Sequence, residues 1–450
     1  MKIVVCAKII KGEINPFDAC ALETALRLSD DVTVVSMAPP SAINELTRLT
    51  RLGAKVISIT DSAYAGSDTL ATSYILSCAI NKIDYDLIIC GRQTIDGDTA
   101  QVGPSLATRL NINLITNVLD VSLNDNTLSC KTRIKDETCT LPALITVERI
   151  NELRFPSIFS KAGTPMLWNN IDLKADLSKC GLNGSPTQVL KTFENEKGKR
   201  HCKFISFNEL DSLIDDLLKK EKSSIEFSPS KTKLKSVWAI GKEVEQEAFA
   251  IAENVIVIDE KDPFKIAEIA RKDCPDVILW SADLWGRKNA PIVASLLETG
   301  LCADCTALEN DGERLYMYRP ALGGNIIAKI ECKTKPQMAT VRTTSDFADI
   351  IVSGGKGVAN KIDKLEKIAL KYNAELGASR GLVDMGKIPY SAQIGLTGKT
   401  VCPKIYIAIG ISGAVHHTVA IENADAIIAI NPDKDARIFE YADFGIIDEF

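Results

Sequence analysis

The sequence predicts an α/β protein in which mostly parallel sheets are covered by helices on both faces. Short apolar runs alternate with amphipathic stretches over most of the 450 residues, which is the pattern of consecutive βαβ units. Aromatic residues make up only 6% of the chain, whereas Ile, Val, Leu and Ala are plentiful. Such aliphatic strands are typical of parallel sheets that are buried on both faces.

The predicted elements of the first half follow one another at short intervals. Strand Lys2–Cys6 leads through a loop at Lys8–Asp18 into a helix at Ala19–Leu28. The next expected elements are strand Val32–Met37, helix Ser41–Arg51, strand Lys55–Ile59, helix Asp68–Asn81 and strand Asp86–Cys90. A polar loop, Gly91–Pro104, then precedes a helix at Ser105–Leu110, and several β segments continue to about residue 150.

A weaker copy of one βα unit recurs in the second half. Asp86–Cys90 resembles Asp276–Trp280, and Pro104–Leu110 resembles Pro291–Leu297, at a nearly constant separation. We therefore expect two related α/β domains, one in each half, although any two βα units share some likeness.

The segment between the two copies, residues 191–235, is rich in charged residues. Ser206 and Glu209 have capping-box spacing, and an apolar stripe follows at Leu210, Leu213, Ile214, Leu217 and Leu218. This pattern predicts one docked helix between solvated flanks, at a junction between two once-separate polypeptides.

A third domain is expected from about residue 346. Strand Asp349–Val352 runs into the glycine-rich loop Ser353–Gly357, and a helix follows at Ile362–Tyr372. Strand Ile405–Ile409 runs into a second loop of small residues, Gly410–Gly413, and a further strand, Ala426–Ile430, ends at Asn431.

Composition and charge exclude several classes of protein. The chain is 46% hydrophobic and 25% charged with a formal net charge of −6, so nucleic acid and anionic lipid are not expected partners. The apolar stretch Ile405–Val415 is too short to span a bilayer, and Lys8 interrupts the apolar start, which argues against a secretory signal. Thirteen cysteines without a framework spacing indicate reduced thiols, so we expect a cytoplasmic protein without membrane insertion.

The glycine-rich loops of the third domain are candidate phosphate-binding sites. A loop directly after a parallel strand lies at the carboxyl edge of the sheet, where backbone N–H groups can face a phosphate. Ser353–Gly357 and Gly410–Gly413 both fit this description, and together they favour a dinucleotide, although tight turns also need glycine. His416 and His417 follow the second loop, and at most one of two adjacent helical residues can face a ligand directly. A structural histidine is the alternative.

The loop Gly91–Pro104 is the second candidate. Asp96, Asp98, Thr99 and Gln101 surround two glycines, a composition that suits ribose hydroxyls and phosphates; a capped turn between strand and helix is equally compatible. Cys302 and Cys305 have metal or redox spacing, but no second pair lies nearby in the sequence, so no metal site is expected. Walker A, HExxH and GxSxG motifs do not occur, so hydrolytic chemistry has no support.

At these motifs the sequence resembles the electron-transferring flavoproteins. Residues 1–205 are similar to the β subunit in Gly91–Pro104, Arg149–Arg154 and Gly184–Thr187. Residues 235–450 are similar to the α subunit, and the matching motifs are Ser353–Gly355, Gly377–Arg380, Gln393–Lys399 and Gly410–His417. The resemblance implies a fusion of both subunits: a β-like α/β domain at 1–205, a linker with a short helix at 206–234, an α-subunit N-terminal-like α/β domain at 235–345 and an FAD-binding domain at 346–450. It further implies that the two α/β domains pack by pseudo-twofold symmetry and that the doubly wound FAD-binding domain is mobile.

The resemblance also implies residue roles around FAD. Arg380 would lie near the isoalloxazine, Thr397 would bond flavin N5 and His417 would lie near flavin O2; these are the expected catalytic residues. A fixed cation or donor there stabilises the negative charge that reduced flavin carries around N1 and O2. The further FAD contacts implied are Ser353, Gly354, Gly355, Lys356, Ser379, Gln393, Ile394, Gly395, Gly410, Ser412, Gly413 and His416, with Asn431 and Glu449 at the adenosine end. Two positions depart from the family pattern: Lys356 stands where many members have Arg, and Leu396 where Gln is common.

The β-like half of the family binds a second nucleotide. It is AMP in some members, and in one subgroup it is a second FAD that takes hydride from NADH and splits the electrons. The forms of Asp96–Pro104 and Tyr318–Asn325 look more like that subgroup, so a second FAD is favoured over AMP. The implied contacts are Cys6, Asn15, Pro16, Phe17, Met37, Gly91, Asp96, Gly97, Asp98, Thr99, Gln101 and Gly103.

The expected function is that of a soluble electron carrier. It would exchange electrons with flavoproteins of the acyl-CoA dehydrogenase type, as in fatty acid oxidation, and the bifurcating subgroup adds NADH as a substrate and ferredoxin or flavodoxin as partners. The competing class is a non-redox nucleotide-binding or sensing protein built from the same domains. A visible absorption spectrum separates the two, because bound flavin is yellow and AMP is colourless.

Overall fold

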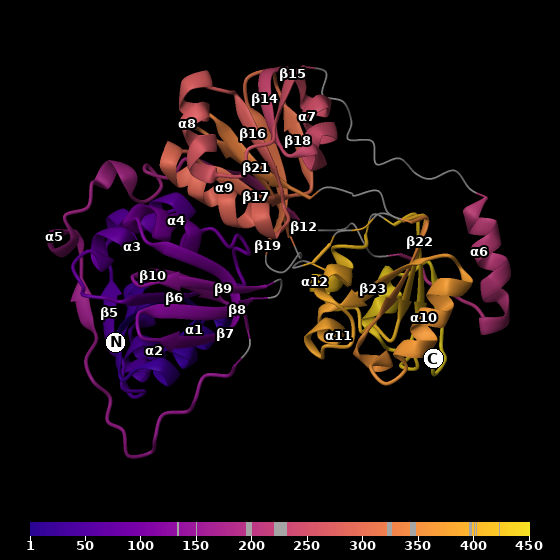
Figure 1. Ribbon diagram of the computed structural model, residues 1–450, viewed down its shortest axis with the longest axis horizontal. Coiled ribbons are helices and arrows are strands. Elements are labelled where there is room, and N and C mark those ends of the chain that lie inside the picture. Colours follow the sequence, from indigo (N-terminus) through magenta and orange to yellow (C-terminus); the bar gives the residue numbers. More distant parts are fainter. Residues whose placement is uncertain are drawn as a thin grey trace. The chain divides into compact units, whose positions relative to one another are not determined.

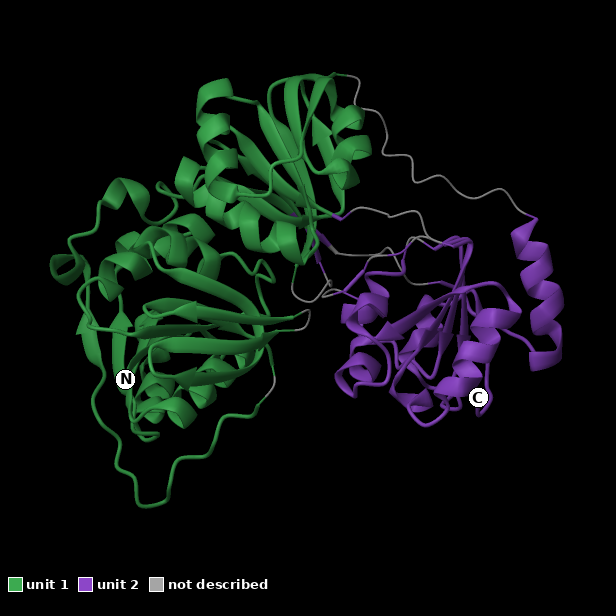
Figure 2. Cartoon of the chain, viewed as in Figure 1, with its two compact units in different colours: residues 1–191, 230–322, 328–341 green, residues 192–229, 323–327, 342–450 purple. Residues whose placement is uncertain are grey.

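The structure is a computed structural model that describes residues 1–132, 135–149, 151–194, 200–219, 232–321, 326–342, 348–395, 398, 399, 401, 403–422 and 424–450. It divides into two compact units (Figure 2). Unit 1 comprises residues 1–191, 230–322 and 328–341, and unit 2 comprises residues 192–229, 323–327 and 342–450.

The largest sheet of unit 1 has the strand order β11-β5-β4-β1-β6-β10-β7-β8-β9. Neighbouring strands are parallel from β11 to β7, whereas β7, β8 and β9 form an antiparallel meander. The strands are β1 (Lys2–Cys6), β4 (Asp31–Met37), β5 (Lys55–Ile59), β6 (Leu87–Gly91), β7 (Asn113–Asn124), β8 (Thr127–Thr132), β9 (Asp136–Thr140), β10 (Ala143–Val147) and β11 (Met166–Trp168). The helices are α1 (Pro16–Leu28), α2 (Ile43–Thr50), α3 (Thr69–Ile80), α4 (Val102–Leu110) and α5 (Asn170–Leu173).

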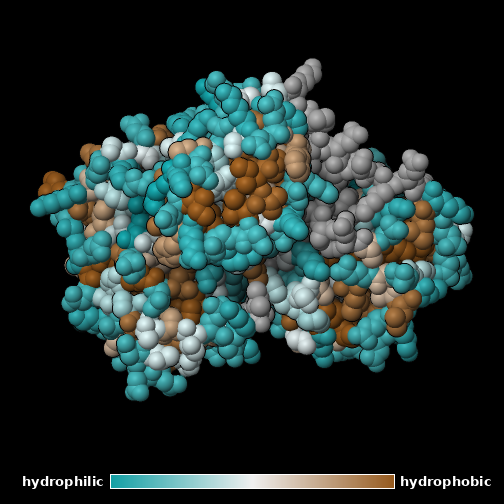
Figure 3. All heavy atoms as spheres, turned by 45° about the horizontal axis from the view of Figure 1, so that its top comes forward, coloured by the Kyte–Doolittle hydropathy of each residue, from teal (hydrophilic) through white to brown (hydrophobic). Residues whose placement is uncertain are grey.

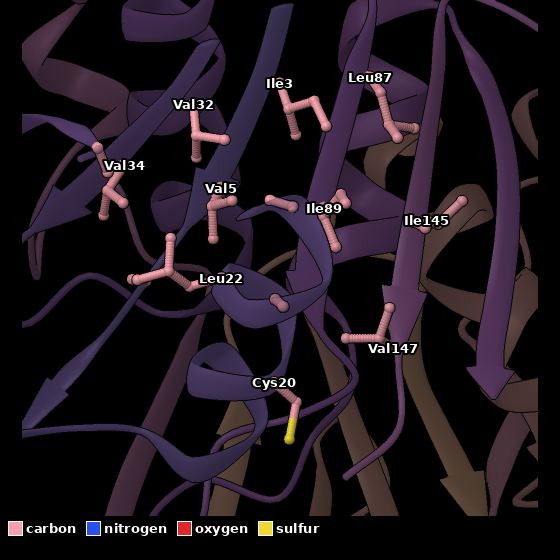
Figure 4. Packing of buried hydrophobic residues seen from close by; sticks show 14 of the residues in the cluster. Ile3, Val5, Cys20, Leu22, Val32, Val34, Leu87, Ile89, Ile145 and Val147 are labelled. Atoms are coloured by element: carbon pink, nitrogen blue, oxygen red, sulfur yellow. The ribbon is translucent and has the colours of Figure 1, made fainter. Parts of the chain in front are cut away.

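Both faces of this sheet are buried. Leu22 of α1 lies in one apolar cluster with Ile3 and Val5 of the central strand (Figure 4). Val4, which points to the opposite face, belongs to a second cluster with Ile75 of α3. Successive strand residues alternate between the faces, so a strand covered on both sides needs an unbroken aliphatic run. This explains why aliphatic residues dominate the composition.

The second half contributes a smaller parallel sheet to unit 1, with the order β15-β14-β16-β21-β17. This order matches β4-β1-β6-β10-β7 strand for strand, which is the relation that the sequence repeat predicts. The strands are β14 (Leu234–Ile240), β15 (Ala252–Ile258), β16 (Val277–Ser281), β17 (Leu301–Cys305) and β21 (Gln337–Val341), and the helices are α7 (Glu245–Ile251), α8 (Pro263–Asp273) and α9 (Leu284–Leu297).

The two repeats of unit 1 meet through their equivalent helices, α4 and α9. The Ser105 hydroxyl donates to the carbonyl oxygen of Pro291 at 3.3 Å, and the Ser295 hydroxyl lies 3.5 Å from the carbonyl oxygen of Ser105. A separate sheet has the order β12-β20-β19-β18, and β2 and β3 form a hairpin. Their bounds are β2 (Ile9–Ile10), β3 (Glu13–Ile14), β12 (Thr187–Glu194), β18 (Ala307–Asn310), β19 (Leu315–Ala321) and β20 (Ile326–Cys332).

Unit 2 is built on one parallel sheet, of which Figure 1 labels β22 and β23. Its strand order is β13-β27-β26-β25-β22-β23-β24. Counted from β22 in chain order, the last six strands read 3-2-1-4-5-6 from β24 to β27, which is the order of a doubly wound dinucleotide-binding fold. The strands are β13 (Lys203–Phe204), β22 (Ile350–Gly354), β23 (Glu375–Ser379), β24 (Gln393–Ile394), β25 (Ile405–Ile409), β26 (Ala426–Ile430) and β27 (Phe444–Ile446), and the helices are α6 (Leu210–Leu218), α10 (Ile362–Lys371), α11 (Arg380–Asp384) and α12 (Val415–Thr418).

The charged middle segment contributes to the core of unit 2. Strand β13 pairs with β27, and Leu210, Ile214 and Leu217 of α6 are buried in the same apolar cluster as the central strands. The Glu209 carboxylate accepts the Ser206 N–H at 2.8 Å, as the capping-box spacing predicts. The sequence shows the helix but not the added edge strand, because a two-residue strand has no periodicity of its own.

Most predicted elements of the chain occur within a few residues of their expected bounds. Helix α1 begins three residues earlier than expected, because Pro16 occupies its first turn, where a missing N–H costs nothing. Within the described ranges, no helix has both the length and the apolarity needed to cross a membrane.

Candidate functional site

The carboxyl edge of the unit 2 sheet brings the predicted glycine-rich loops together. Strands β22 and β25 are adjacent and parallel, and the chain leaves them in opposite directions, toward β23 and toward β26. This is the topological switch point, where open α/β sheets bind ligands. Loops Ser353–Gly357 and Gly410–Gly413 follow these two strands, so they meet at the switch point.

The two loops touch each other through bare backbone. A Cβ atom at Gly355 would lie 2.1 Å from the carbonyl oxygen of Gly410, and one at Gly413 would lie 2.2 Å from the backbone nitrogen of Ile438. Gly413 also has a φ of +84°, a conformation that side chains disfavour. The glycines are therefore required by the fold itself, and they leave main-chain groups at the edge of the sheet.

Two cations lie beside these loops. The aliphatic stem of Lys356 passes over Gly381, where an added Cβ would lie 2.5 Å from Lys356 Cε. Arg380 directly precedes Gly381, and its Nε lies 3.2 Å from the Asp384 carboxylate. Lys356 follows β22 and Arg380 follows β23 at the start of α11, so the tertiary structure places both charges at one edge.

His417 and His416 differ sharply in environment. His417 is buried, with Nε2 2.9 Å from the Tyr406 hydroxyl and Nδ1 3.0 Å from the Ile394 carbonyl oxygen. Burial lowers the pKa of His417 to about 4, against the opposing hydrogen bond to Ile394. His416 is exposed. Both nitrogens of His417 are thus engaged inside unit 2, and its expected role beside flavin O2 stays a prediction.

The other residues predicted for FAD are spread along the same edge. Ser353, Gly354, Gln393, Ile394 and Gly395 are buried, Ser379 and Gly410 are half-buried, and Ser412 and Glu449 are exposed. The Asn431 amide donates to the Ile411 carbonyl oxygen at 3.0 Å and accepts the Asp433 N–H at 2.9 Å, so it shapes the loop after β26. Thr397 lies outside the described residues. Glu449 lines a pocket of about 310 Å³ beside α10 with Phe207, Lys364 and Lys367.

The residues present fit a dinucleotide such as FAD. The close contact between Gly355 and Gly410 leaves bare main chain at this edge, and Lys356 and Arg380 add positive charge beside it. A pyrophosphate needs close backbone approach and compensating charge, and this edge offers both.

The loop Gly91–Pro104 of unit 1 follows β6 at the corresponding edge of the large sheet. Asp98 and Ala100 have φ values of +51° and +56°, which non-glycine residues adopt only where the surroundings impose them. Of the loop glycines, Gly103 is packed against the Thr146 methyl, where a Cβ would lie 2.6 Å away. A Cβ atom at Gly97 would not clash with the protein, because its nearest neighbour would be the Thr94 hydroxyl at 3.4 Å.

Most polar side chains predicted to bind the second nucleotide are used inside the protein. Asp96 pairs with Lys8 at 2.6 Å, and the Asp98 carboxylate accepts the Gln93 amide at 3.0 Å. Gln101 donates to the Leu301 carbonyl oxygen at 3.0 Å, which ties the loop to the second repeat of unit 1. These side chains hold the loop in shape, and its main chain and glycines are left to face a ligand.

The remaining predicted contacts surround the start of this loop. Cys6 is buried in register with Cys90 on β6, and Asn15 and Phe17 are buried at the start of α1. Pro16, Met37, Gly91, Gly97 and Thr99 are half-buried. No group of three His, Cys, Asp or Glu residues that could hold a metal occurs among the described residues.

Arg319 belongs to the motif Tyr318–Asn325, but it is not among the contacts predicted for the second nucleotide. Arg319 is 5% exposed on β19, and its guanidinium donates to the Gly97 carbonyl oxygen at 2.7 Å. Its Nε and second terminal nitrogen find no hydrogen-bond partner among the described residues. A buried cation with unused donors is costly, and an anionic ligand would satisfy it. The sequence motifs associate both segments with the second nucleotide, but Arg319 is 222 residues away from Gly97, and their direct contact is visible only in the folded chain.

More cations lie on another side of the loop. A small cavity of about 20 Å³ is lined by Arg92, Ala100, Arg287 and Lys288, among others. Arg92 lies 3.6 Å from the buried Glu148 carboxylate, and Arg287 pairs with the buried Asp304 at 2.6 Å. The loop is thus bordered by Arg side chains from both repeats of unit 1.

Fold and site together define a nucleotide-binding α/β protein with a dinucleotide site in a doubly wound unit. Comparison with known families agrees: the electron transfer flavoprotein domain matches residues 3–161 and 240–366, and the electron transfer flavoprotein FAD-binding domain matches residues 346–422. The chain belongs to the electron transfer flavoprotein family.

Individual relatives match one half of the chain each. Electron transfer flavoprotein subunit alpha of Thermoanaerobacterium thermosaccharolyticum is 40% identical over 229 residues, which covers 40% of this chain and 69% of the relative. Electron transfer flavoprotein subunit beta of Clostridium acetobutylicum is 40% identical over 197 residues, which covers 41% of this chain and 76% of the relative. Protein FixA of Azorhizobium caulinodans is 37% identical over 234 residues, which covers 46% of this chain and 83% of the relative. This pattern is that of a β-like half and an α-like half fused in one chain.

Proposed function

We propose that this chain carries electrons between flavoprotein dehydrogenases of the acyl-CoA dehydrogenase type and a separate acceptor, through FAD held in unit 2. The observation that carries the proposal is the switch point between β22 and β25, where two glycine loops and the cations Lys356 and Arg380 lie at one edge. FAD, when bound, supplies the exchange of one or two electrons. A cytoplasmic location belongs to the same proposal.

The test is reduction by a partner. The purified yellow protein is mixed anaerobically with a catalytic amount of an acyl-CoA dehydrogenase and its acyl-CoA, and flavin absorbance is followed. Bleaching that requires both dehydrogenase and substrate supports the carrier function. A protein whose flavin is never reduced by any dehydrogenase of this type, or that purifies without flavin, contradicts it.

An exposed apolar loop of unit 1 supports docking to such a partner. Phe155, Ile158 and Phe159 are 93%, 85% and 87% exposed, on an extended segment between β10 and β11 (Figure 1). The face that Figure 3 shows is a mixture of hydrophilic residues and several hydrophobic patches. Exposed apolar clusters of this kind mark interaction sites in proteins.

The backbone of this loop is held by hydrogen bonds and an ion pair, although its apolar side chains are exposed. Arg51 donates to the carbonyl oxygens of Ser157 and Ser160 at 3.1 and 3.2 Å, and Arg154 pairs with the buried Glu23 at 2.9 Å. A preordered apolar loop loses little entropy on binding. Phe159→Ser should therefore slow reduction by the dehydrogenase at least tenfold while flavin content stays unchanged. Leu177→Ser, which removes another exposed apolar side chain of unit 1, is the control.

We further propose that unit 1 binds a second FAD and that NADH is its electron donor, with ferredoxin or flavodoxin as an acceptor. Arg319, buried beside Gly97 with unused donors, supports an anionic ligand at this loop. Nucleotides released on denaturation are quantified by chromatography. Two FAD per chain together with NADH oxidation support the proposal, whereas one FAD and one AMP reject it and leave the simple carrier.

A further inference from the structure

The carboxyl group of Asp18 joins three elements of unit 1. Asp18 lies in the first turn of α1 and is 5% exposed. Its Oδ2 accepts the Lys8 N–H at 2.8 Å, and its Oδ1 accepts the Gly91 N–H at 3.2 Å. Lys8 follows β1 and Gly91 ends β6, so one carboxyl group fixes the carboxyl ends of two adjacent strands to the start of a helix.

Asn15 extends this connection along the loop. Its amide donates to the Gln93 carbonyl oxygen at 2.9 Å, and its oxygen accepts the Ile95 N–H at 3.3 Å. Lys8 Nζ then meets the Asp96 carboxylate at 2.6 Å. The first half of the loop is therefore held by contacts at Gly91, Gln93, Ile95 and Asp96, up to the residue before Gly97.

The contact between Asp18 and Gly91 leaves no free space. A Cβ at Gly91 would lie 2.3 Å from Asp18 Oδ1, so the backbone of the loop runs directly against the carboxyl group. Any change in the length or charge of this side chain must move the main chain at the start of the loop.

We propose that Asp18 is a positioning residue of the nucleotide site in unit 1, which sets the loop 91–103 for its ligand by binding the main chain of Lys8 and Gly91. The ligand is an adenine nucleotide with a phosphate or pyrophosphate group, and the inference rests on the proposed second nucleotide site. Asp18 does not touch the ligand; it acts through the loop.

The protonation state of the Asp18 carboxyl group should change near neutral pH. Burial raises the pKa of Asp18 to about 7, although the hydrogen bonds from Lys8, Asn15 and Gly91 and the charge of Lys8 oppose this. The charged or titratable groups around it are Lys8, Cys90 on β6, and Arg92, which stacks on the neighbouring Phe17 ring at 5.5 Å. The carboxylate accepts both N–H groups, whereas protonation turns one oxygen into a donor. We therefore expect both hydrogen bonds to hold the loop in its ligand-binding shape above about pH 7.

The experiment compares Asp18→Asn with Asp86→Asn in the full chain. Asp86 accepts the Lys2 N–H at 2.7 Å, which is the same kind of bond between the same two strands at their opposite ends. Each protein is freed of nucleotide in unit 1, and AMP and FAD are titrated calorimetrically one pH unit below and one above 7. FAD is included because the charge of its pyrophosphate is constant in this range.

We expect D18N to bind nucleotide at least tenfold more weakly than the parent above pH 7, and to lose the pH dependence that the parent shows. D86N should bind like the parent, and the flavin of unit 2 should be unaffected in both. Equal affinities and equal pH profiles of D18N and parent overturn the role of Asp18 alone. A parent that binds neither AMP nor a second FAD overturns the nucleotide site itself. If D18N does not fold, the FAD affinity of the parent carries the test: a value that stays constant across this range contradicts the proposal.

Discussion

The Nε2 atom of His417 lies 2.9 Å from the Tyr406 hydroxyl, and both rings are buried in unit 2. Because Nδ1 faces the Ile394 carbonyl oxygen at 3.0 Å, Nδ1 carries the ring proton and Nε2 accepts the hydroxyl proton. The imidazole is therefore neutral in the folded protein, and it links β25 to the strand β24 through α12.

This arrangement predicts a loss of stability in acid. His417 titrates near pH 4 in the folded state and near about 6.5 when unfolded, so the unfolded state binds the extra proton first. The contribution is constant above about pH 6.5, and stability falls by up to about 1.4 kcal/mol per pH unit as the pH drops toward 4. The free energy of unfolding in urea, measured as a pH series, should show a shallower slope for His417→Gln than for the parent. His416→Gln, at the exposed neighbour, should keep the slope of the parent. If H417Q follows the parent at every pH, the buried neutral ring is not the cause.

Arg380→Ala should leave FAD bound and make it harder to reduce. Arg380 is the cation at the start of α11 beside the switch-point loops, and reduction adds negative charge to flavin. Loss of one charged contact costs on the order of 1–3 kcal/mol, and about 60 mV corresponds to 1.4 kcal/mol for one electron. Spectroelectrochemical titration should therefore give a potential lowered by roughly 40 to 130 mV. Lys367→Ala, an exposed cation on α10, serves as the control. An unchanged potential in R380A would place Arg380 away from the isoalloxazine.

Cleavage between residues 219 and 232 should leave the two fragments bound to each other. Strand β13 and helix α6 precede the cut, yet β13 pairs with β27, and Leu210 and Ile214 are buried in the core of unit 2. A tether mainly raises the effective concentration of parts that already associate. Gel filtration at micromolar concentration should give one peak of unchanged size. Ile214→Asp should weaken the complex, because it buries an unpaired charge. Separation of the parent fragments would show that the covalent link is essential.

Gly97→Val should remove the nucleotide of unit 1 and spare the fold. Position 97 has room on the protein side, so only a ligand that approaches the main chain should be blocked. Gly103→Val is the contrasting variant: its side chain would overlap the Thr146 methyl and should lower the melting temperature instead. Nucleotide content per chain and thermal unfolding are measured for both. Full occupancy in G97V would mean that the ligand does not approach this turn.

Local patterns were sufficient for much of the fold and part of the site. The strand at Lys2–Cys6 and the loops after β22 and β25 follow from aliphatic runs and glycine spacing, which need only a few consecutive residues. Gln101 lies in the predicted loop and Asn15 lies against it, but the side chains of both bind the protein rather than an open cleft. Hydrogen-bond partners are set by the surroundings, and a motif cannot distinguish a ligand contact from a structural one.

The sequence by itself determined the α/β class, the duplication in unit 1 and the glycine loops of unit 2, because each depends on periodicity or on spacing along the chain. The tertiary structure alone decided that Arg319 lies against Gly97 across 222 residues, that β13 joins the sheet of unit 2, and that Asp18 holds both Lys8 and Gly91. These relations depend on which strands become neighbours and which polar groups are removed from water, and both are properties of the packed chain rather than of any local segment.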